Sequence, residues 1–471
     1  MAIRFGTDGW RAVIAEEFTF EAVARLTQAL ARVWRRRAGR QTPRAAVGYD
    51  RRFLSERFAR LAAEVLAGNG FRVRLSREPC PTPALCVAAR RPGSLGGVMI
   101  TASHNPPEFN GYKVKLAHGG SADAAFCEAV EAELDAAPPK RLPLPEAAGQ
   151  RRIVLADLRE PHLRAVRRVV DWSALKGARL RVAHDALHGA GAGAFDRLLA
   201  ETGLRLSSWR QSRDPLFGGV SPEPAPANYA ETRVRMRRAP QDLCLVTDGD
   251  ADRFAALDER GEPVSNQHLI CLVLDYLIRH RGARGPVVLA VNTTRMAEKI
   301  CEEFGLSVHA SPVGYKRICK KMLDVDAAFG LEESGSLAWR RHLPDRDGVA
   351  AGMWLLERMA VERKPLSAQI AALQARYGPH CYRSVKLRLP RGQQTRIMER
   401  LRAAPPDRAA GKPVEQLIAI DGIKLVFRDG SWLMLRPSGT EPLFRVYAEA
   451  PSRSALDRLI RAGKRLAQAA R

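Results

Sequence analysis

The chain has 471 residues, of which 46% are hydrophobic and 27% are charged. This length exceeds one hydrophobic core and suggests three or four domains, and the composition excludes a disordered or fibrous protein. The formal net charge of +25 would suit nucleic acid or another acidic partner, but the basic residues are spread along the whole chain and aromatic residues make up only 6%, so we attribute the total charge to solvated, arginine-rich faces.

No apolar stretch reaches the length that a membrane-spanning helix needs. The longest, HLICLVLDYLI at 268–278, is interrupted by Asp275. The beginning, MAIRFGTDGWR, lacks the apolar core of a signal peptide. The eight cysteines are scattered without a C-x-x-C pair, which is typical of reduced thiols. We therefore expect a cytoplasmic protein with no membrane and no nucleic-acid partner.

Strand-like apolar runs alternate with helix-like stretches through most of the chain, which predicts α/β units with largely parallel sheets. The predicted strands are AAVGYD (45–50), FRVRLS (71–76), LRVAHD (180–185), DLCLVTD (242–248) and PVVLAVN (286–292). The predicted helices are SERFARLAAEVLAGNG (55–70), FDRLLAETG (195–203), NQHLICLVLDYLIRHRG (266–282) and RMAEKICEEFG (295–305).

Two segments resemble linkers: AAPPKRLPLPEAAGQ at 136–150 and RYGPHC at 376–381. After the second, the pattern changes to a β-meander with an Asp429-Gly430 hairpin turn, closed by a basic amphipathic helix from about Arg453. We expect three mixed α/β domains followed by a smaller C-terminal α+β domain. Their expected ranges are 1–140, 150–257, 258–376 and 380–471.

The first polar cluster, MITASHNPPEFNGYKVK, follows a predicted strand. It places Ser103 and His104 together on what we expect to be an exposed loop, with Lys113 ten residues further along. A hydroxyl nucleophile needs a neighbouring base or metal. The alternative interpretation is an ordinary polar turn, because Ser, His and Asn favour turns in any protein.

The second cluster, TDGDADR, follows another strand and brings Asp248, Asp250 and Asp252 close together. Three carboxylates so near one another repel unless a cation lies between them, and oxygen ligands suit Mg²⁺ or Ca²⁺. An EF-hand is excluded because Arg253 takes the position that requires glycine. A solvated acidic turn is the alternative.

Two later clusters could bind a substrate. In GLEESGSL (330–337), Glu332 and Ser334 could hydrogen-bond sugar hydroxyls, although an exposed acidic loop has the same composition. In RPSGTEPLFR (436–445), donors between two arginines could form an anion cradle, or simply a turn between strands; these residues are Arg436, Ser438, Gly439, Thr440 and Arg445.

Two motifs imitate known sites. HDALH (184–188) is similar to the zinc motif H-E-x-x-H but lacks its Glu and runs into glycines, so we expect a strand-end loop. GAGAGA (189–194) loosely fits the dinucleotide fingerprint, but it starts several residues after the strand. Close helix–sheet packing explains these glycines better.

Together, the four clusters resemble the α-D-phosphohexomutase family, which includes phosphoglucomutases and phosphomannomutases. The resemblance runs from RFGTDGWR (4–11) to RPSGTEPLFRVYAEA (436–450), and the phosphoserine, metal, sugar and phosphate loops follow in the family's order, one per domain. The family's fold has three similar α/β domains and a smaller fourth around one cleft, which agrees with the arrangement expected from the chain.

The resemblance implies roles for these residues. Ser103 would carry a phosphoryl group, and the three aspartates would hold one Mg²⁺ with an oxygen of that group. Arg253 and Lys113 would stabilise the transferred phosphoryl group, Lys113 would serve as general acid/base with help from His104, and Arg11 would contact the reacting phosphate. A hexose 1-phosphate held by the cradle would become hexose 6-phosphate through a 1,6-bisphosphate, with glucose 1,6-bisphosphate as activator and intermediate.

The sugar loop and PVGYKRI (312–318) are more similar to a phosphoglucomutase-like branch, which adds Gly314 and Lys316 as expected substrate contacts. The metal loop has Ala251 where many members have glycine. Glucose phosphates are the expected substrates, with phosphomannomutase or dual specificity as the alternative, and the chain is expected to be a monomer or homodimer. A metal-dependent phosphatase and a non-catalytic phosphosugar- or nucleic-acid-binding protein are further alternatives.

Overall fold

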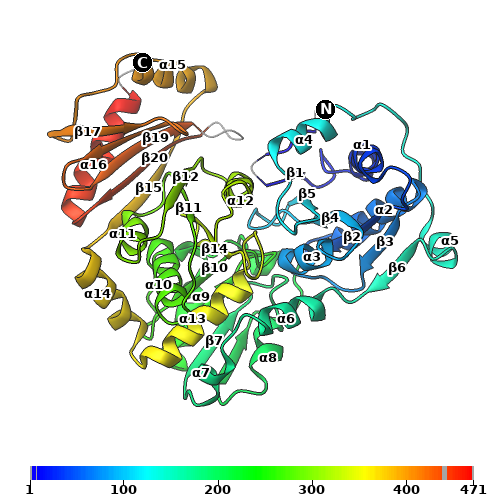
Figure 1. Cartoon of the computed structure of the whole chain (residues 1–471), viewed down its shortest axis with the longest axis horizontal. Helices are drawn as coiled ribbons and strands as arrows, with labels where there is room; N and C mark the ends of the chain where they lie inside the picture. Colours follow the sequence, from blue (N-terminus) through cyan, green and yellow to red (C-terminus); the bar gives the residue numbers. More distant parts are fainter. Residues whose placement is uncertain (1–2, 7, 438–442, 469–471) are drawn as a thin grey trace.

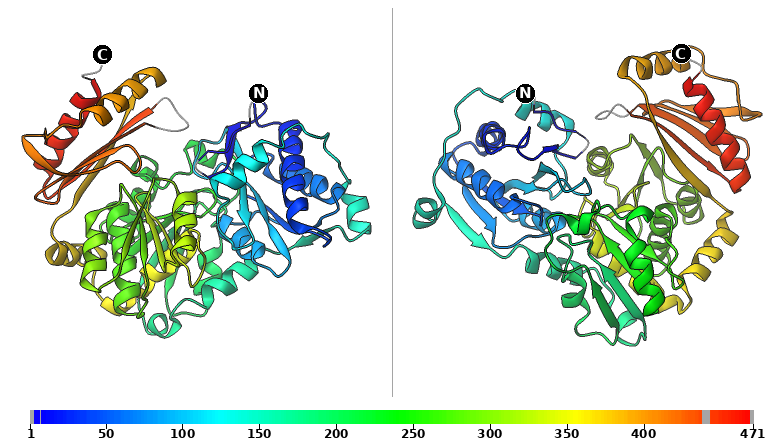
Figure 2. Two further views of the ribbon diagram at one scale, coloured as in Figure 1. Left: turned by 45° about the horizontal axis from the view of Figure 1, so that its top comes forward. Right: turned by 180° about the vertical axis from the view of Figure 1, so that it is seen from behind.

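The computed structural model describes residues 3–6, 8–437 and 443–468. They form four sheets, each with its own helices, arranged along an arc (Figure 1). The first and fourth domains lie at opposite ends of this arc, and the second and third lie between them, in the further views as well (Figure 2). The expected order of three α/β domains and a smaller fourth is confirmed.

The first domain has a six-stranded sheet in the order β1-β5-β4-β2-β3-β6. Its strands are β1 (Trp10–Val13), β2 (Arg44–Tyr49), β3 (Arg72–Ser76), β4 (Ser94–Ile100), β5 (Phe109–Leu116) and β6 (Ile153–Ala156). Its helices are α1 (Phe20–Ala38), α2 (Ser55–Gly68), α3 (Thr82–Ala89), α4 (Ala124–Glu131) and α5 (Leu144–Gly149). Strands β4, β2, β3 and β6 run parallel, so their carboxyl ends share one edge of the sheet.

We expected the first domain to end at residue 140 and the second to begin at residue 150, but the first sheet continues beyond this boundary. Strand β6, which we expected within the second domain, pairs with β3 and completes the first sheet. The Pro- and Ala-rich segment before it packs against the first domain, where Leu142 N donates to the Glu64 carbonyl at 3.0 Å. A proline-rich composition indicates an irregular chain, but it does not say whether the chain leaves its domain.

The second and third domains each have a four-stranded sheet, in the orders β10-β9-β7-β8 and β12-β11-β13-β14. The second has β7 (Arg181–Asp185), β8 (Arg205–Trp209), β9 (Leu243–Thr247), β10 (Phe254–Leu257), α6 (Arg159–Arg167), α7 (Trp172–Lys176), α8 (Ala194–Leu199) and α9 (Ala230–Arg238). The third has β11 (Val287–Ala290), β12 (Val308–Ser311), β13 (Phe329–Glu332), β14 (Ser336–Trp339), α10 (Asn266–Arg279), α11 (Arg295–Glu303), α12 (Tyr315–Asp324), α13 (Gly348–Glu362) and α14 (Leu366–Tyr377).

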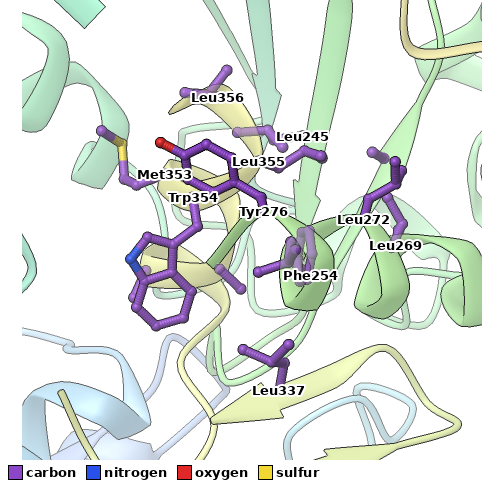
Figure 3. Close-up of a cluster of buried hydrophobic side chains, with 14 of the residues drawn as sticks. Leu245, Phe254, Leu269, Leu272, Tyr276, Leu337, Met353, Trp354, Leu355 and Leu356 are labelled. Atoms are coloured by element: carbon purple, nitrogen blue, oxygen red, sulfur yellow. The ribbon is translucent and has the colours of Figure 1, made fainter. Parts of the chain in front are cut away.

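One continuous hydrophobic core joins these two domains. This core includes Trp354 of α13, Leu245 of β9, Phe254 of β10 and Leu337 of β14, so residues from both sheets and from α13 share one interior (Figure 3). The apolar stretch at 268–278 is part of α10 and is buried in the same core. Within the described residues, no helix has the length and apolar character to cross a membrane.

The fourth domain is antiparallel, in the order β15-β20-β19-β18-β17-β16. It contains β15 (Cys381–Arg388), β16 (Arg408–Ala409), β17 (Lys412–Ile418), β18 (Ile423–Phe427), β19 (Trp432–Pro437), β20 (Leu443–Ala450), α15 (Arg391–Ala403) and α16 (Arg453–Gln468). The expected hairpin turn at Asp429-Gly430 joins β18 to β19. Gly430 has a φ of 79°, a conformation that glycine adopts without steric strain.

Candidate active site

Ser103 follows β4 at the edge where the parallel strands of the first domain end. Its hydroxyl donates to Asp248 Oδ2 at 3.0 Å and lies 3.4 Å from His104 Nδ1. We expected Ser103 on an exposed loop, and this was wrong: its exposed fraction is 0%. The metal loop of the second domain covers it, a contact between residues 145 apart in the chain.

The serine loop is held by residues that the sequence analysis missed. The Arg52 guanidinium donates to four carbonyl oxygens of the loop, those of Ser103, Asn105, Pro106 and Phe109, at 2.5–3.0 Å. Asp50 accepts from the Thr101 hydroxyl at 2.6 Å, and Thr101 Oγ1 accepts from Ser103 N at 2.8 Å. Asp50 directly follows a buried strand, as Asp248 does. This shared position could have identified Asp50 from the sequence as a residue of the site.

The three aspartates of the metal loop converge as expected. One carboxylate oxygen from each of Asp248, Asp250 and Asp252 lies within 4.8 Å of the others. Burial, and next the charges of the two neighbours, raise the pKa of Asp248 well above its usual range. Oδ1 of Asp250 and Oδ1 of Asp252 are buried without a hydrogen-bond partner. Unpartnered, crowded carboxylate oxygens fit a hard divalent cation such as Mg²⁺.

Lys113 and Arg346 neutralise much of this negative charge. Lys113, on β5, places Nζ 2.8 Å from Asp250, 2.9 Å from Asp252 and 2.9 Å from Asp8. Burial alone would lower the pKa of Lys113, but these carboxylates raise it above its usual value, so the side chain is a charged ammonium. The Arg346 guanidinium donates to Asp8 at 2.6 Å and to Asp252 at 2.9 Å. Neither Asp8 nor Arg346 was identified from the sequence.

The remaining groups near Ser103 are a neutral imidazole and two arginines. Burial lowers the pKa of His104 well below its usual value, and the positive charges of Arg253 and Arg11 lower it further. Arg11 Nη1 donates to the Asn105 side-chain oxygen at 2.8 Å, which fixes the guanidinium beside the serine loop. Arg253 Nε is buried without a hydrogen-bond partner.

The sugar-loop candidates come together in the third domain. Glu332 Oε1 accepts from Gly314 N at 3.1 Å, and Oε2 accepts from the Ser334 hydroxyl at 2.8 Å. Arg346 Nη1 lies 3.7 Å from Glu332, which links the sugar loop to the metal loop. Lys316 does not join this group, because its Nζ donates to the Gly6 carbonyl of the first domain at 2.6 Å.

The phosphate-cradle residues are only partly described. Ser438, Gly439 and Thr440 lie outside the described residues. Arg436 Nε donates to Asp421 Oδ2 at 2.8 Å, and the same oxygen accepts from Val313 N at 2.9 Å. Asp421 thus connects Arg436 to the loop that precedes α12. Arg445 is opposite Arg436 in the β19–β20 pair.

The two motifs that imitate known sites have structural roles. His184 and Asp185 end β7, and His188 lies in the loop that follows, as expected. A side chain on Gly191 would come within 2.5 Å of Thr247 Oγ1, and one on Gly189 within 2.7 Å of the Asp248 carbonyl. The glycines therefore allow this loop to pack directly against the metal loop.

Comparisons with known proteins cover nearly the whole chain. Four family profiles match it in order: Phosphoglucomutase/phosphomannomutase alpha/beta/alpha domain I at 2–140, domain II at 160–261, domain III at 265–377 and the C-terminal domain at 385–462. A Phosphoglucomutase/phosphomannomutase from Thermococcus kodakarensis is 30% identical over 448 residues, which cover 95% of this chain and 94% of that protein.

Two further relatives have different names. A Phosphoglucosamine mutase from Halorhodospira halophila is 30% identical over 458 residues, which cover 97% of this chain and 94% of its own. The crystal structure of a Thermus thermophilus protein assigned as a phosphomannomutase superposes with a TM-score of 0.87 at 32% identity, covering 99% of both chains.

Proposed function

The chain belongs to the phosphoglucomutase/phosphomannomutase family of phosphomutases, and we propose that it interconverts glucose 1-phosphate and glucose 6-phosphate through a phosphoserine at Ser103. The observation that carries this proposal is the position of Ser103. Its hydroxyl lies 3.0 Å from an aspartate of a buried triad, beside an ammonium and several guanidinium groups. A nucleophile, a cation site and fixed positive charges are what phosphoryl transfer requires.

In the proposed cycle, phosphorylated Ser103 gives its phosphoryl group to O6 of glucose 1-phosphate. The serine P–O bond breaks as a bond from phosphorus to O6 forms, the O6 proton passes to a nearby base, and the serine oxygen takes up a proton. The resulting 1,6-bisphosphate reorients, and the Ser103 hydroxyl gives up its proton as its oxygen bonds to the phosphorus on O1. The P–O1 bond breaks, and O1 takes up a proton. Glucose 6-phosphate leaves, and the enzyme is phosphorylated again.

The residues near Ser103 would transfer protons and stabilise the charge of the phosphoryl group. His104, neutral at pH 7 and 3.4 Å from the hydroxyl, is suited to accept the serine proton. Lys113 is charged and is suited to stabilise the transferred group and to return a proton to an oxygen, and Arg11 and Arg253 add positive charge. Asp248, Asp250 and Asp252 would hold Mg²⁺, which when bound would neutralise charge on the phosphoryl oxygens.

Substrate preference rests on the third and fourth domains. We propose that Glu332 and Ser334 bind the ring hydroxyls, with Gly314 holding the carboxylate in place, and that Lys316 acts only at the edge of the site. Arg436 and Arg445, together with residues 438–440, would bind the phosphate that does not react. Mannose phosphates are the second candidate, because one relative and one similar structure carry such names.

A coupled assay for glucose 6-phosphate tests this function. The purified chain is incubated with glucose 1-phosphate, with and without Mg²⁺ and trace glucose 1,6-bisphosphate, and then with the 1-phosphates of mannose and glucosamine. We expect Mg²⁺-dependent mutase activity that is highest with glucose. Intact-mass measurement should find one phosphoryl group on the wild type and none on Ser103→Ala, which should lose at least 10³-fold in rate.

Other outcomes identify the alternatives. Release of inorganic phosphate in proportion to substrate consumed would identify a phosphatase. Preference for mannose or glucosamine 1-phosphate would correct the substrate. Full mutase activity in Ser103→Ala would refute the phosphoserine, and absence of turnover together with salt-sensitive DNA binding would favour a nucleic-acid-binding protein.

A further inference from the structure

A pocket of about 420 Å³ lies in the first domain. It is formed where four parallel strands begin, β2 at Arg44, β3 at Arg72, β4 at Ser94 and β6 just after Arg152. Six arginines line it: Arg44, Arg72, Arg74, Arg91, Arg151 and Arg152. None of the described residues that line it is acidic.

These six arginines have few partners within the protein. Within the described residues, none of the six pairs with a carboxylate, and their side chains make one hydrogen bond, from Arg152 Nη1 to the Gly70 carbonyl at 2.9 Å. On the same domain, Arg60 and Arg141 both pair with Glu64. Other arginines of this domain also lack a carboxylate partner, so what distinguishes this pocket is that six such arginines line one cavity with no acidic residue among its lining.

Arg74, like Arg152, is half-buried, whereas the other four are exposed. Arg74 Nε is buried without a hydrogen-bond partner. Burial, and next the charge of Arg91, lower the pKa of Arg74 from its usual value. A half-buried guanidinium whose Nε has no partner, beside a second positive charge, is stabilised by an anion that accepts from both.

The floor of the pocket is apolar. It consists of Ala45, Ala46, Val73, Ala88 and Val154. Val154 is 51% exposed, although it lies in a strand. Pockets of this volume bind small molecules. Apolar side chains contact the ligand's ring, and a few polar groups fix the orientation of the ligand.

We propose that this pocket binds a nucleoside polyphosphate, with the phosphates on the arginines and the base or ribose on the apolar floor. Planar guanidinium groups bind phosphate oxygens in pairs, and several of them can share a di- or triphosphate. The shared chemistry, two or more phosphates on a small molecule, also describes a hexose bisphosphate. The apolar floor favours the nucleotide, and the experiment below separates the two.

The pocket is distinct from the site at Ser103. Strand β4 begins at Ser94 in the pocket and ends at Ile100, three residues before Ser103. Strand β2 likewise runs from Arg44 to Tyr49, next to Asp50, which with Arg52 holds the serine loop. Six or seven residues of strand separate the two sites by about 20 Å. A nucleotide and a sugar phosphate could therefore be bound at the same time.

Calorimetric titration with ATP in the presence of EDTA tests the proposal. Two variants remove binding groups: the double variant Arg74→Gln/Arg91→Gln, and Val154→Glu, which puts a carboxylate on the exposed floor. A matched double variant, Arg35→Gln/Arg40→Gln, removes the same charge from exposed positions of the same domain. We expect one ATP per chain, a Kd at least ten-fold higher in both pocket variants, and a Kd within two-fold of wild type in the control.

Tripolyphosphate and glucose 1,6-bisphosphate serve as comparison ligands. Both should bind the pocket at least five-fold more weakly than ATP, and mutase activity should be unchanged in the pocket variants, which also reports that they are folded. The proposal is overturned if wild type does not bind ATP, if the control loses binding equally, if glucose 1-phosphate displaces ATP, or if either comparison ligand matches ATP. Each result is independent of the sugar on which the enzyme acts.

Discussion

The charged side chains near Ser103 form a buried network in which positive and negative charges offset one another. Lys113 is shared by three carboxylates, and Arg346 is shared by two of the same three, Asp8 and Asp252. Although burial alone would raise the pKa of Asp8, Lys113, Lys115 and Arg346 hold it well below its usual range. Removing one charge from such a network leaves its partners buried and unpaired, which is costly.

Asp250→Asn should lower cation affinity and rate together. The change keeps the shape of the side chain and removes one negative charge from the triad, so Mg²⁺ loses a charged ligand and Lys113 loses one of its partners. We expect the Mg²⁺ concentration for half-maximal activity to rise at least ten-fold and the maximal rate to fall at least ten-fold. Asp242→Asn, outside this site, is the control. An unchanged Mg²⁺ dependence would place the metal elsewhere.

Glu332→Gln tests the sugar loop more sharply than a change to alanine. Glutamine can still accept from Gly314 N and can donate to Ser334, so the loop keeps its shape and loses only the charged acceptor for hydroxyls. A hydrogen bond to a charged group contributes about 1.5–3 kcal/mol. We expect kcat/KM to fall roughly ten- to hundred-fold, for glucose and mannose alike, because O3 and O4 are the same in both sugars.

Two controls accompany this variant. Glu333→Gln changes the neighbouring carboxylate, whose pKa is raised by burial and by Glu332, and should affect the rate less. Phosphorylation of Ser103, measured by intact mass, should remain in Glu332→Gln. A loss confined to one sugar would mean that Glu332 reads the epimeric position instead.

Two loops at strand ends form the candidate active site, and their close approach depends on Gly249. A Cβ on this residue would lie 2.4 Å from the Ser103 carbonyl and 3.2 Å from Pro222. The metal loop can therefore reach the serine loop only because no side chain intervenes.

Gly249→Ala should separate the two loops and lower kcat. A displacement of about 1 Å in a catalytic group can reduce the rate about 10²-fold, and we expect a loss of that size with KM changed less than five-fold. Gly177→Ala is the matched control, since nothing lies within 4 Å of its Cβ. Near-normal kcat in Gly249→Ala would mean that the loops do not need this contact.

Helix α13 carries a buried carboxylate that should make stability depend on pH. Glu357 accepts from the Tyr276 hydroxyl at 2.9 Å and pairs with Arg281. Burial raises the pKa of Glu357 to about 7. Since the unfolded value is about 4.5, this group's stabilising contribution is full below pH 4.5 and is lost as pH rises to about 7.

Glu357→Gln should remove this dependence. Between pH 5 and pH 8, the wild type should lose roughly 2 kcal/mol relative to the variant, from the shift of the pKa to about 7. Urea unfolding at both pH values measures the difference, and Glu399→Gln, exposed on α15, is the control. Parallel pH profiles for wild type and Glu357→Gln would show that burial does not raise the pKa of this carboxyl group.

At the scale of the whole molecule, the four domains form three large hydrophobic cores. Among the described residues, the first and fourth domains have their own, whereas the second and third share the one that includes Trp354. The shared core helps to keep the metal loop and the sugar loop at a fixed distance and orientation, because both loops are connected to strands that pack in it. The shared core predicts that the second and third domains unfold together.

Trp354→Ala should destabilise both domains at once, by about 3–5 kcal/mol, the usual range for a buried aromatic side chain replaced by alanine. Calorimetry should show the corresponding single transition shifted to lower temperature, with the transitions of the first and fourth domains unchanged. Trp172→Ala, which only borders the same core, should shift it less. Separate transitions for the second and third domains would contradict a shared core.

The sequence by itself determined the α/β alternation, the antiparallel fourth domain and the convergence of Asp248, Asp250 and Asp252, because these follow from local periodicity, turn residues and near neighbours in the chain. It also singled out Ser103 and Lys113, which follow or lie on adjacent strands. Motifs that lie on a predicted strand or directly follow one could therefore be predicted.

Only the tertiary structure decided that Ser103 is buried, that β6 belongs to the first sheet, and that Arg52, Asp8 and Arg346 complete the site. These residues act across separations of about 50 to 340 positions, and no local pattern distinguishes one arginine from the others in a chain with 76 Lys and Arg. Burial and pairing arise when distant strand ends meet, so they depend on how the domains pack and not on the residues beside them.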